Sequence, residues 1–288
     1  MAAGGNLICG LGELLWDMLP TGERLGGAPA NFAVMAGRLG NHSVIASRLG
    51  GDALGERARA VLKDFSVDLS YLQTDGQQPT GTVGVEIAKG EPRYVIHAPA
   101  AWDFLEWTPA WRALAQEADA VCFGTLAQRE HVSRETIAKF LAATRAECIR
   151  VFDVNLRAPF FSAEVVAASI KTATLFKLNE GEVPVVMELL GGPTKTEIAD
   201  AAHWLLGRYP LKMVAVTMGG EGSLLVTREA MHRHPGVDVQ VADTVGAGDA
   251  FTAGLVDAYL RGASLAEMNE AANRWGAWVA SKPGAMPV

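Results

Sequence analysis

Short apolar runs alternate along the chain with longer segments that have helical periodicity. The runs are bounded by glycines or polar residues, which is typical of buried strands. They span residues 6–12, 43–49, 120–124, 149–155, 175–178 and 213–217. The helical segments span residues 56–65, 132–144, 194–208 and 265–280. Strands that alternate with helices predict a parallel sheet covered on both faces, so we expect a three-layer α/β/α fold.

A different pattern occupies residues 80–98, where two β-rich runs flank the turn sequence at 89–92. Alternating apolar and polar positions on both sides of a turn predict a β-hairpin. Residues 13–20 are predicted to form another strand. Together these segments indicate a small second sheet beside the main one.

Residues 243–249, Asp-Thr-Val-Gly-Ala-Gly-Asp, join two predicted elements. Alternation over residues 237–241 predicts a half-buried strand before them. Apolar residues at four-residue spacing from Phe251 predict an amphipathic helix after them. The amides of a helix N-terminus are unpaired and the helix dipole is positive there, so small residues at this point favour an anion, above all phosphate.

Asp249 falls in the first turn of that helix. We expect the helix dipole to keep its carboxylate ionised, so that it can accept a hydroxyl proton beside the bound phosphate. The same residues would also suit a capped helix after a tight turn. The second aspartate, Asp243, brackets the loop and favours the functional interpretation.

Residues 26–31, Gly-Gly-Ala-Pro-Ala-Asn, begin another predicted helix, with Pro29 in its first turn. Paired glycines would let the main chain and Asn31 approach a small polar ligand, although a Gly-Gly turn with a solvated Asn31 is the alternative. Asp17 lies among large apolar residues and needs either solvent or a polar partner. An exposed position on an edge strand would also explain it.

Polar residues follow the predicted strands at the edge where open α/β sheets bind ligands. Asn155 ends one predicted strand and Arg157 comes just after it, while Asn179 and Glu182 follow the next strand. Arg157 could contact phosphate or form a surface ion pair. Glu182 could bind a hard cation, or it could simply be an acidic residue in the first turn of a helix.

Composition excludes several other classes. The 288 residues are 49% hydrophobic and 20% charged with a net charge of −7, which disfavours disorder and nucleic-acid or membrane partners. Cys9, Cys122 and Cys148 are widely spaced in apolar runs, which indicates free thiols in a reducing compartment. The sequence shows neither a secretory signal pattern nor an apolar run long enough to span a membrane. We therefore expect a soluble, cytoplasmic protein.

Residues 243–249 resemble the C-terminal signature of the ribokinase-type (PfkB) carbohydrate kinases, and residues 26–31 resemble the N-terminal signature of the same family. The resemblance covers nearly the full length and implies one ribokinase-like domain over residues 1–288. It also implies a lid formed by about 13–24 and 80–98, which covers the sugar and often supplies a homodimer contact.

The resemblance implies a role for each matching residue. Catalysis is assigned to Asp249 as base, to the amides of Gly246, Ala247 and Gly248 as anion hole, and to Arg157. Sugar binding is assigned to Asp17, Gly26, Gly27, Asn31, Asn155 and Asp249. ATP binding is assigned to Asn179, Thr217, Gly219, Gly222, Gly246, Gly248, Asn273 and Ala277. Glu182 is assigned to Mg²⁺, and a monovalent cation, K⁺, is implied near the anion hole.

The opening Gly-Glu-x-Leu-x-Asp at residues 12–17 and the Asp-x-Asn-x-Arg segment at 153–157 look most like fructokinases. Ketodeoxygluconate kinase, ribokinase and nucleoside kinase remain open. A non-catalytic sugar- or nucleotide-binding protein is disfavoured because Asp249 is present. A dinucleotide-dependent oxidoreductase is disfavoured because Gly10 and Gly12 are not followed by a third glycine and a helix in register.

Overall fold

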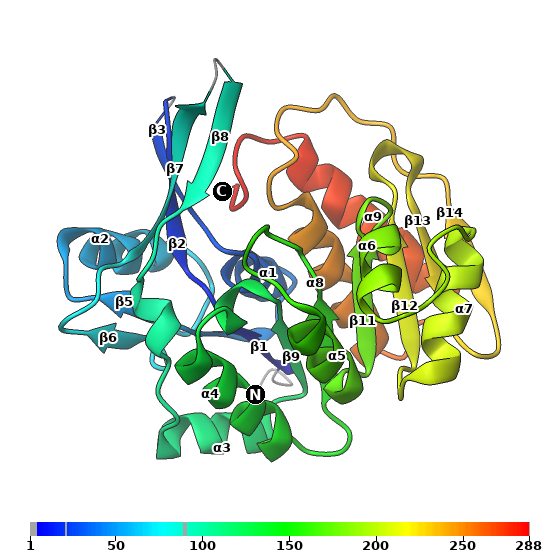
Figure 1. Cartoon of the computed structure of the whole chain (residues 1–288), viewed down its shortest axis with the longest axis horizontal. Coiled ribbons are helices and arrows are strands. Elements are labelled where there is room, and N and C mark those ends of the chain that lie inside the picture. Colours follow the sequence, from blue (N-terminus) through cyan, green and yellow to red (C-terminus); the bar gives the residue numbers. More distant parts are fainter. Residues whose placement is uncertain (1–4, 21, 89–90, 288) are drawn as a thin grey trace.

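The computed structural model describes residues 5–20, 22–88 and 91–287. Its centre is an eight-stranded sheet in the order β14-β13-β12-β11-β10-β9-β1-β4 (Figure 1). In chain order the strands are β1 (Leu7–Leu11), β4 (His42–Ala46), β9 (Ala120–Phe123), β10 (Ile149–Asp153), β11 (Leu175–Asn179), β12 (Met213–Thr217), β13 (Ser223–Val226) and β14 (Met231–His234).

Helices cover both faces of this sheet, as predicted. One apolar core gathers under α1 (Ala28–Arg38), α2 (Ala53–Leu62), α8 (Ala247–Leu260) and α9 (Leu265–Ala280). The other gathers under α3 (Pro109–Glu117), α4 (His131–Ala143), α5 (Ala163–Thr172), α6 (Glu182–Leu189) and α7 (Ile198–Arg208). In β1, Ile8 belongs to the first core and Cys9 to the second, because successive strand residues point to opposite faces.

Three phenylalanines on adjacent strands fix the register at the middle of the sheet. Phe152 lies opposite Phe123 on β9 and Phe176 on β11. The rings stack with centroids 5.2 and 5.3 Å apart, in the offset geometry that aromatic pairs favour. The carboxyl ends of these three strands are thereby held level, which aligns the residues that follow them.

Two predictions about the sheet were wrong. Strand β13 runs antiparallel to both of its neighbours, β12 and β14, because the short connections at 219–222 and 227–230 fold the chain straight back where a parallel strand would need a long crossover. Residues 237–241 form no strand in the structure. Their alternation has no ladder partner, since the chain leaves β14 at the edge of the sheet and crosses to α8 as a loop.

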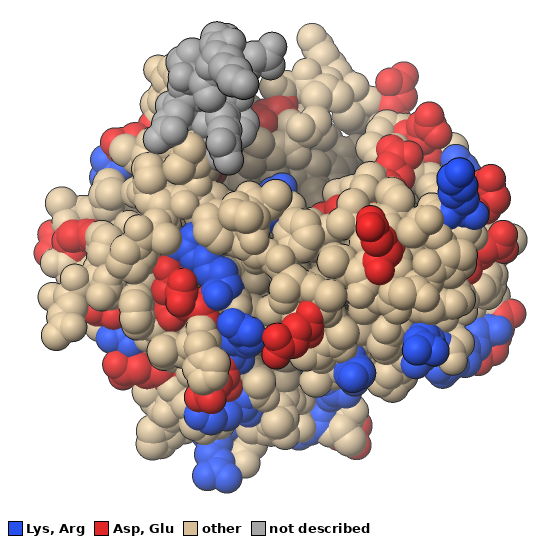
Figure 2. Space-filling view, in the orientation of Figure 1, with Lys and Arg blue, Asp and Glu red and all other residues tan. Residues whose placement is uncertain are grey.

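A small sheet is built from the two expected stretches, in the order β3-β2-β7-β8. Its strands are β2 (Leu15–Leu19), β3 (Gly22–Gly26), β7 (Gly81–Ala88) and β8 (Glu91–Ile96), and residues 89–90 of the predicted turn lie outside the described residues. Figure 1 shows this sheet rising from one side of the main body. In the same orientation the molecular surface is hollowed beside it (Figure 2).

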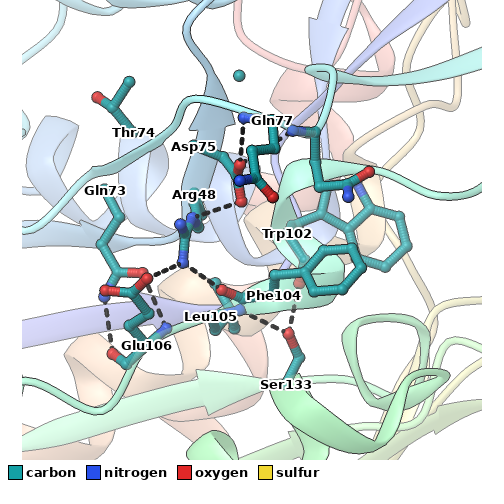
Figure 3. A network of polar contacts seen from close by, with 12 residues as sticks. Arg48, Gln73, Thr74, Asp75, Gln77, Trp102, Phe104, Leu105, Glu106 and Ser133 are labelled. Carbon is teal, nitrogen blue, oxygen red and sulfur yellow. Dashed lines mark hydrogen bonds and ion pairs between the residues drawn. The ribbon is translucent and has the colours of Figure 1, made fainter.

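A polar network secures the base of the small sheet. Arg48, in the short pair β5 (Arg48–Gly50) and β6 (Gln73–Asp75), lies 3.0 Å from the Asp75 carboxylate and 2.7 Å from that of Glu106 (Figure 3). Ser133 of α4 accepts the amide of Leu105 and donates to the Trp102 carbonyl. These bonds tie the segment after β8 to the body of the protein.

The three cysteines are buried free thiols. Over the described ranges, the helices are too short or too polar to cross a membrane.

Candidate active site

The candidate site lies where α8 begins, beside the carboxyl ends of β1, β10 and β11. Gly246 is the residue before the helix and has a φ of 79°, in the left-handed region that glycine favours. A Cβ at this position would lie 2.6 Å from the Cβ of Ala285. Conformation and space therefore both require glycine here.

Not all the predicted anion-hole amides are equally available. The Ala247 amide donates to the Thr244 carbonyl at 3.2 Å, as part of the turn into α8. Within the part of the chain that the structure describes, the amides of Gly246 and Gly248 are left for an anion. The positive end of the helix dipole lies at the same point.

Asp249 and Asn31 bring the two sequence signatures into contact. The Asn31 Nδ2 donates to Asp249 Oδ2 at 2.7 Å, across 218 positions of sequence. Asn31 is buried in the first turn of α1. That helix begins after Gly27, where φ is 112° and a Cβ would lie 2.5 Å from the Glu13 carbonyl oxygen.

The environment of Asp249 differs from the expectation of a fully ionised carboxylate. Desolvation raises its pKa to about 7, and the charge of Asp153 adds to the rise. The Asn31 hydrogen bond and the cations Lys177 and Arg157 act in the opposite direction but do not cancel it. A base is most effective when its pKa lies near the working pH, so this shift suits proton transfer.

Lys177 is a buried cation directly behind the loop that we expect to form the anion hole. Its Nζ donates to Asp153 Oδ1 at 3.1 Å, and a Cβ on Gly248 would lie 3.0 Å from the same Nζ. Burial alone would lower the pKa of Lys177, but Asp153, Glu182 and Asp249 outweigh it and raise that pKa. The ammonium group therefore stays charged at neutral pH.

Sequence reasoning did not assign Lys177 a role. A charged residue inside the apolar run 175–178 was the available signal, because buried lysines need a charged partner.

Two further carboxyl groups face the same region. Asp17 on β2 is half-buried, and desolvation raises its pKa, as does the charge of Asp243, while Arg157 lowers it. Gly26 makes room for Asp17, since a Cβ there would lie 3.0 Å from Asp17 Oδ2.

Glu13, two residues after the end of β1, is almost completely buried and was not assigned by sequence reasoning. Burial raises its pKa to about 7, the charge of Asp249 adds to the rise, and Arg157 opposes it. Its place in the Gly-Glu-x-Leu-x-Asp opening was the available signal.

Asn155 and Arg157 lie in the loop after β10, on the same edge. Asn155 has a φ of 39°, a left-handed conformation that asparagine adopts more readily than most residues. Arg157 is exposed, and its charge lowers the pKa values of Glu13, Asp17 and Asp249. The guanidinium is therefore close enough to act on all three carboxyl groups.

Glu182 and Asn179 cap each other at the start of α6. Glu182 Oε2 accepts the Asn179 amide at 2.8 Å, and Asn179 Oδ1 accepts the Glu182 amide at 3.0 Å. Glu182 Oε1 accepts the amide of Leu156 at 2.8 Å. Glu182 thus joins the ends of β10 and β11, and its predicted contact with a metal stays a prediction.

The residues predicted for the nucleotide lie around the β12–β13 turn and α9. Thr217 ends β12, while Gly219 and Gly222 have φ values of 55° and 83°. Ala277 is half-buried on α9. Asn273 is buried, and its Nδ2 donates inside the protein, to Ser223 Oγ and the Asn269 carbonyl, each at 2.7 Å.

Comparison with known proteins places these features in a family. The model of the pfkB family of carbohydrate kinases matches residues 19–288. A crystal structure of an uncharacterized sugar kinase from Pyrococcus horikoshii superposes with a TM-score of 0.81 at 30% identity, over 98% of this chain and 94% of that one. A second crystal structure of that protein is a complex with ATP.

Two relatives are named for different substrates. A fructokinase from Escherichia coli is 33% identical over 85% of this chain and 82% of its own length. An aminoimidazole riboside kinase from Salmonella typhimurium is 28% identical over 98% of this chain and 91% of its own length. Since the family model spans nearly the whole sequence and known kinases align along most of it, the chain belongs to the pfkB family of carbohydrate kinases.

Proposed function

We propose that the protein transfers the γ-phosphate of ATP to a primary hydroxyl of a small sugar, with fructose as the first candidate. The observation that carries this proposal is the position of Asp249. Its carboxyl group has a pKa near 7 and directly follows the loop that presents amides to an anion. A base at this point can take a hydroxyl proton while a phosphate is held beside it.

Buried acceptors support a polyol as the second substrate. Asn31 Oδ1 and Glu13 Oε2 are buried and lack a hydrogen-bond partner within the described residues. Such acceptors are costly unless a donor reaches them, and sugar hydroxyls are donors. Asp17 and Asn155 add further polar groups, and Gly26 and Gly27 let Asp17 and the Glu13 backbone pack closely beside them.

The chemistry follows from these positions. As the sugar oxygen attacks the γ-phosphorus, Asp249 takes the hydroxyl proton and the bond from phosphorus to the ADP oxygen breaks. The amides of Gly246 and Gly248 and the guanidinium of Arg157 stabilise the charge on the transferred group. Lys177 contributes positive potential from behind Gly248, where burial keeps water from screening it, and its partner Asp153 offsets part of that charge.

Magnesium fits this site as an ion carried by nucleotide phosphates and water. Within the described ranges, no three His, Cys, Asp or Glu side chains are grouped to hold a metal. Both oxygens of Glu182 already accept backbone amides. Because Mg²⁺ retains several waters, we assign Glu182 and Asn179 contact with it through water. When bound, the ion neutralises phosphate charge.

Potassium is assigned no side-chain ligand in this proposal. Asp243, at the start of the loop that leads into α8, already forms an ion pair with Arg24. The distance from Arg24 Nη1 to Asp243 Oδ2 is 2.8 Å. A comparison of rates in K⁺ and in choline chloride measures any requirement for the ion.

The remaining parts of the site have supporting roles in the proposal. ATP would extend from the anion-hole loop towards Thr217, Gly219 and Ala277. The small sheet would act as a lid that excludes water, a competing phosphoryl acceptor. A homodimer formed through this sheet stays a prediction, as does a location in the cytoplasm.

The test is ADP release with Mg-ATP across fructose, ribose, ketodeoxygluconate, tagatose and adenosine, with Asp249→Asn measured in parallel. We expect fructose to give the highest rate and the variant to lose about 10²–10⁴-fold in kcat. An active variant would contradict the role of Asp249. Binding of ATP or sugar without any acceptor-dependent rate would favour a non-catalytic binding protein.

A riboside is the second candidate acceptor, because one relative of similar identity is an aminoimidazole riboside kinase. Aminoimidazole riboside is therefore added to the panel. A higher kcat/KM for it than for fructose would replace the first candidate while leaving the kinase mechanism intact.

A further inference from the structure

Strand β3 is attached to the rest of the protein on both of its faces. Glu23 and Arg24 are consecutive, so their side chains point to opposite sides of the small sheet. Glu23 forms an ion pair with Arg57 of α2. Arg24 Nη1 lies 2.8 Å from Asp243 Oδ2, in the loop that leads into α8. The small sheet is thus linked to the anion-hole loop by one side chain.

Asp243 determines the shape of that loop. Its Oδ1 accepts the amide of Val245 at 3.0 Å, and its Oδ2 accepts the amide of Gly284 at 3.1 Å. Gly246 directly follows Val245, and its amide is one of the two that are left to bind an anion. The positive charge of Arg24 therefore acts on the carboxylate that holds the anion-hole loop against the segment around residue 284.

Arg24 also lies next to the sugar side of the site. Asp17 on β2 is its direct cross-strand partner, so both side chains leave the sheet on the same face. The charge of Asp243 acts on Asp17 as well. One strand pair thus carries the proposed sugar ligand and, opposite it, the cation bound to the anion-hole loop.

The Arg24–Asp243 pair contributes little to stability. The two side chains are 38% and 24% exposed, and pairs with this much solvent access are worth about 0–1 kcal/mol. Replacing Arg24 should therefore leave the protein folded. The pair instead fixes the position of β3 relative to the loop that leads into α8.

We propose that Arg24 is a positioning residue that couples the acceptor site to the nucleotide site. A sugar held by Asp17 fixes the strand pair β2–β3, and Arg24 then holds the anion-hole loop in the form that binds phosphate. Because coupling between two sites is reciprocal, bound nucleotide strengthens sugar binding by the same factor. This inference rests on the proposed function.

The experiment is calorimetric titration of the full chain with Mg²⁺ and a non-hydrolysable ATP analogue, with and without saturating fructose or whichever acceptor is active. In the wild type we expect the acceptor to raise analogue affinity by about 5-fold or more, within the usual range for coupled sites. In Arg24→Gln that ratio should fall below about 2-fold, and Arg24→Lys, which keeps the charge, should retain part of it.

Glu23→Gln is the matched control, since it breaks the ion pair on the opposite face of the same strand. Unchanged coupling in Glu23→Gln with lost coupling in Arg24→Gln supports the proposal. Equal coupling in the wild type and Arg24→Gln overturns it, and so does equal loss in both variants. A wild type that binds neither ligand contradicts the proposed function instead.

A second measurement needs no ligand. Hydrogen exchange of the peptide that spans 243–249 should be faster in Arg24→Gln than in the wild type and unchanged in Glu23→Gln, because the Asp243 carboxylate holds the Val245 amide. Identical exchange in all three proteins would also overturn the proposal. Together the two measurements separate a failure of the link from a failure of the kinase assignment.

Discussion

Asn31 Nδ2 and Asp249 Oδ2 lie 2.7 Å apart, so the side chain expected to bind the acceptor also holds the carboxylate that we propose as the base. The bond occupies one carboxylate oxygen and leaves Oδ1 as the atom that can receive a proton. It also fixes the rotamer of Asp249 relative to α1. In the proposed mechanism, acceptor recognition and proton transfer therefore share one junction between α1 and α8.

The first prediction concerns the pH dependence of the rate. Asp249 accepts a proton only when ionised, and its pKa is about 7, so kcat/KM should rise with pH and level off above about 7. Arg157 lowers this pKa, so Arg157→Gln should move the acid limb to higher pH and reduce kcat by about 10²-fold. Full pH profiles of the wild type and the variant check this. An acid limb at the same pH in both proteins would show that Arg157 does not affect the pKa of Asp249.

The second prediction concerns stability. Because folding raises the pKa of Asp249 above its usual value of 3.8, the stability that this group contributes is present in acid and is lost as pH rises towards 7. Asp249→Asn should therefore unfold at a higher temperature than the wild type at pH 8, and the difference should shrink as pH falls from 7 towards 4. Thermal unfolding at several pH values measures it, at about 2–4 °C for each kcal/mol.

The third prediction compares two glycines at opposite ends of α8. Gly246 and Gly262 have φ values of 79° and 72°, but a Cβ at Gly246 would meet Ala285 at 2.6 Å, whereas at Gly262 the space within 4 Å is open. Each alanine variant should lose about 1–2 kcal/mol of stability from the left-handed conformation. Only Gly246→Ala should lose more than this, together with nucleotide affinity. Equal losses would show that the contact with Ala285 can relax.

The fourth prediction concerns a buried ion pair near the small sheet. Arg129 donates to Asp103 at 2.8 and 2.7 Å, stacks 4.0 Å from the Trp102 ring centroid, and is almost fully buried with its partner. Arg129→Met leaves a buried carboxylate alone and should cost about 3–5 kcal/mol of unfolding free energy.

The control for that pair is Arg145→Met, which breaks the exposed pair with Asp119 and should cost about 0–1 kcal/mol. Urea unfolding of both variants decides the matter. Similar costs would mean that water reaches Asp103.

Much of the fold could be predicted because its signals are local. The helix from Phe251 and the strand before Asn179 follow from spacing and apolar runs alone. The strand expected at 237–241 failed because alternation describes a side-chain pattern and says nothing about a neighbouring strand to pair with. For the same reason, the side-chain pattern did not indicate that β13 runs antiparallel to its neighbouring strands.

The candidate site was predictable where residues share a contiguous motif, and not where charges are buried by tertiary structure. Asp249 and Asn31 stood out by sequence, but their contact spans most of the chain. The contacts of Lys177 and Arg24 could not be predicted, because they depend on what lies behind Gly248 and opposite β3. The pKa of Asp249 was missed for the same reason, since desolvation is a property of the packed site.

The contact between the motif loop and the segment around Gly284 has a consequence for biosynthesis. Asp243 is made 41 residues before Gly284, which is a delay of about 2–8 s at 5–20 residues per second. During that interval the sheet and α1 are already complete in sequence, yet the loop lacks the backbone that shapes it. A nascent chain would pass through this period with the loop unable to take the shape that we propose for phosphate binding.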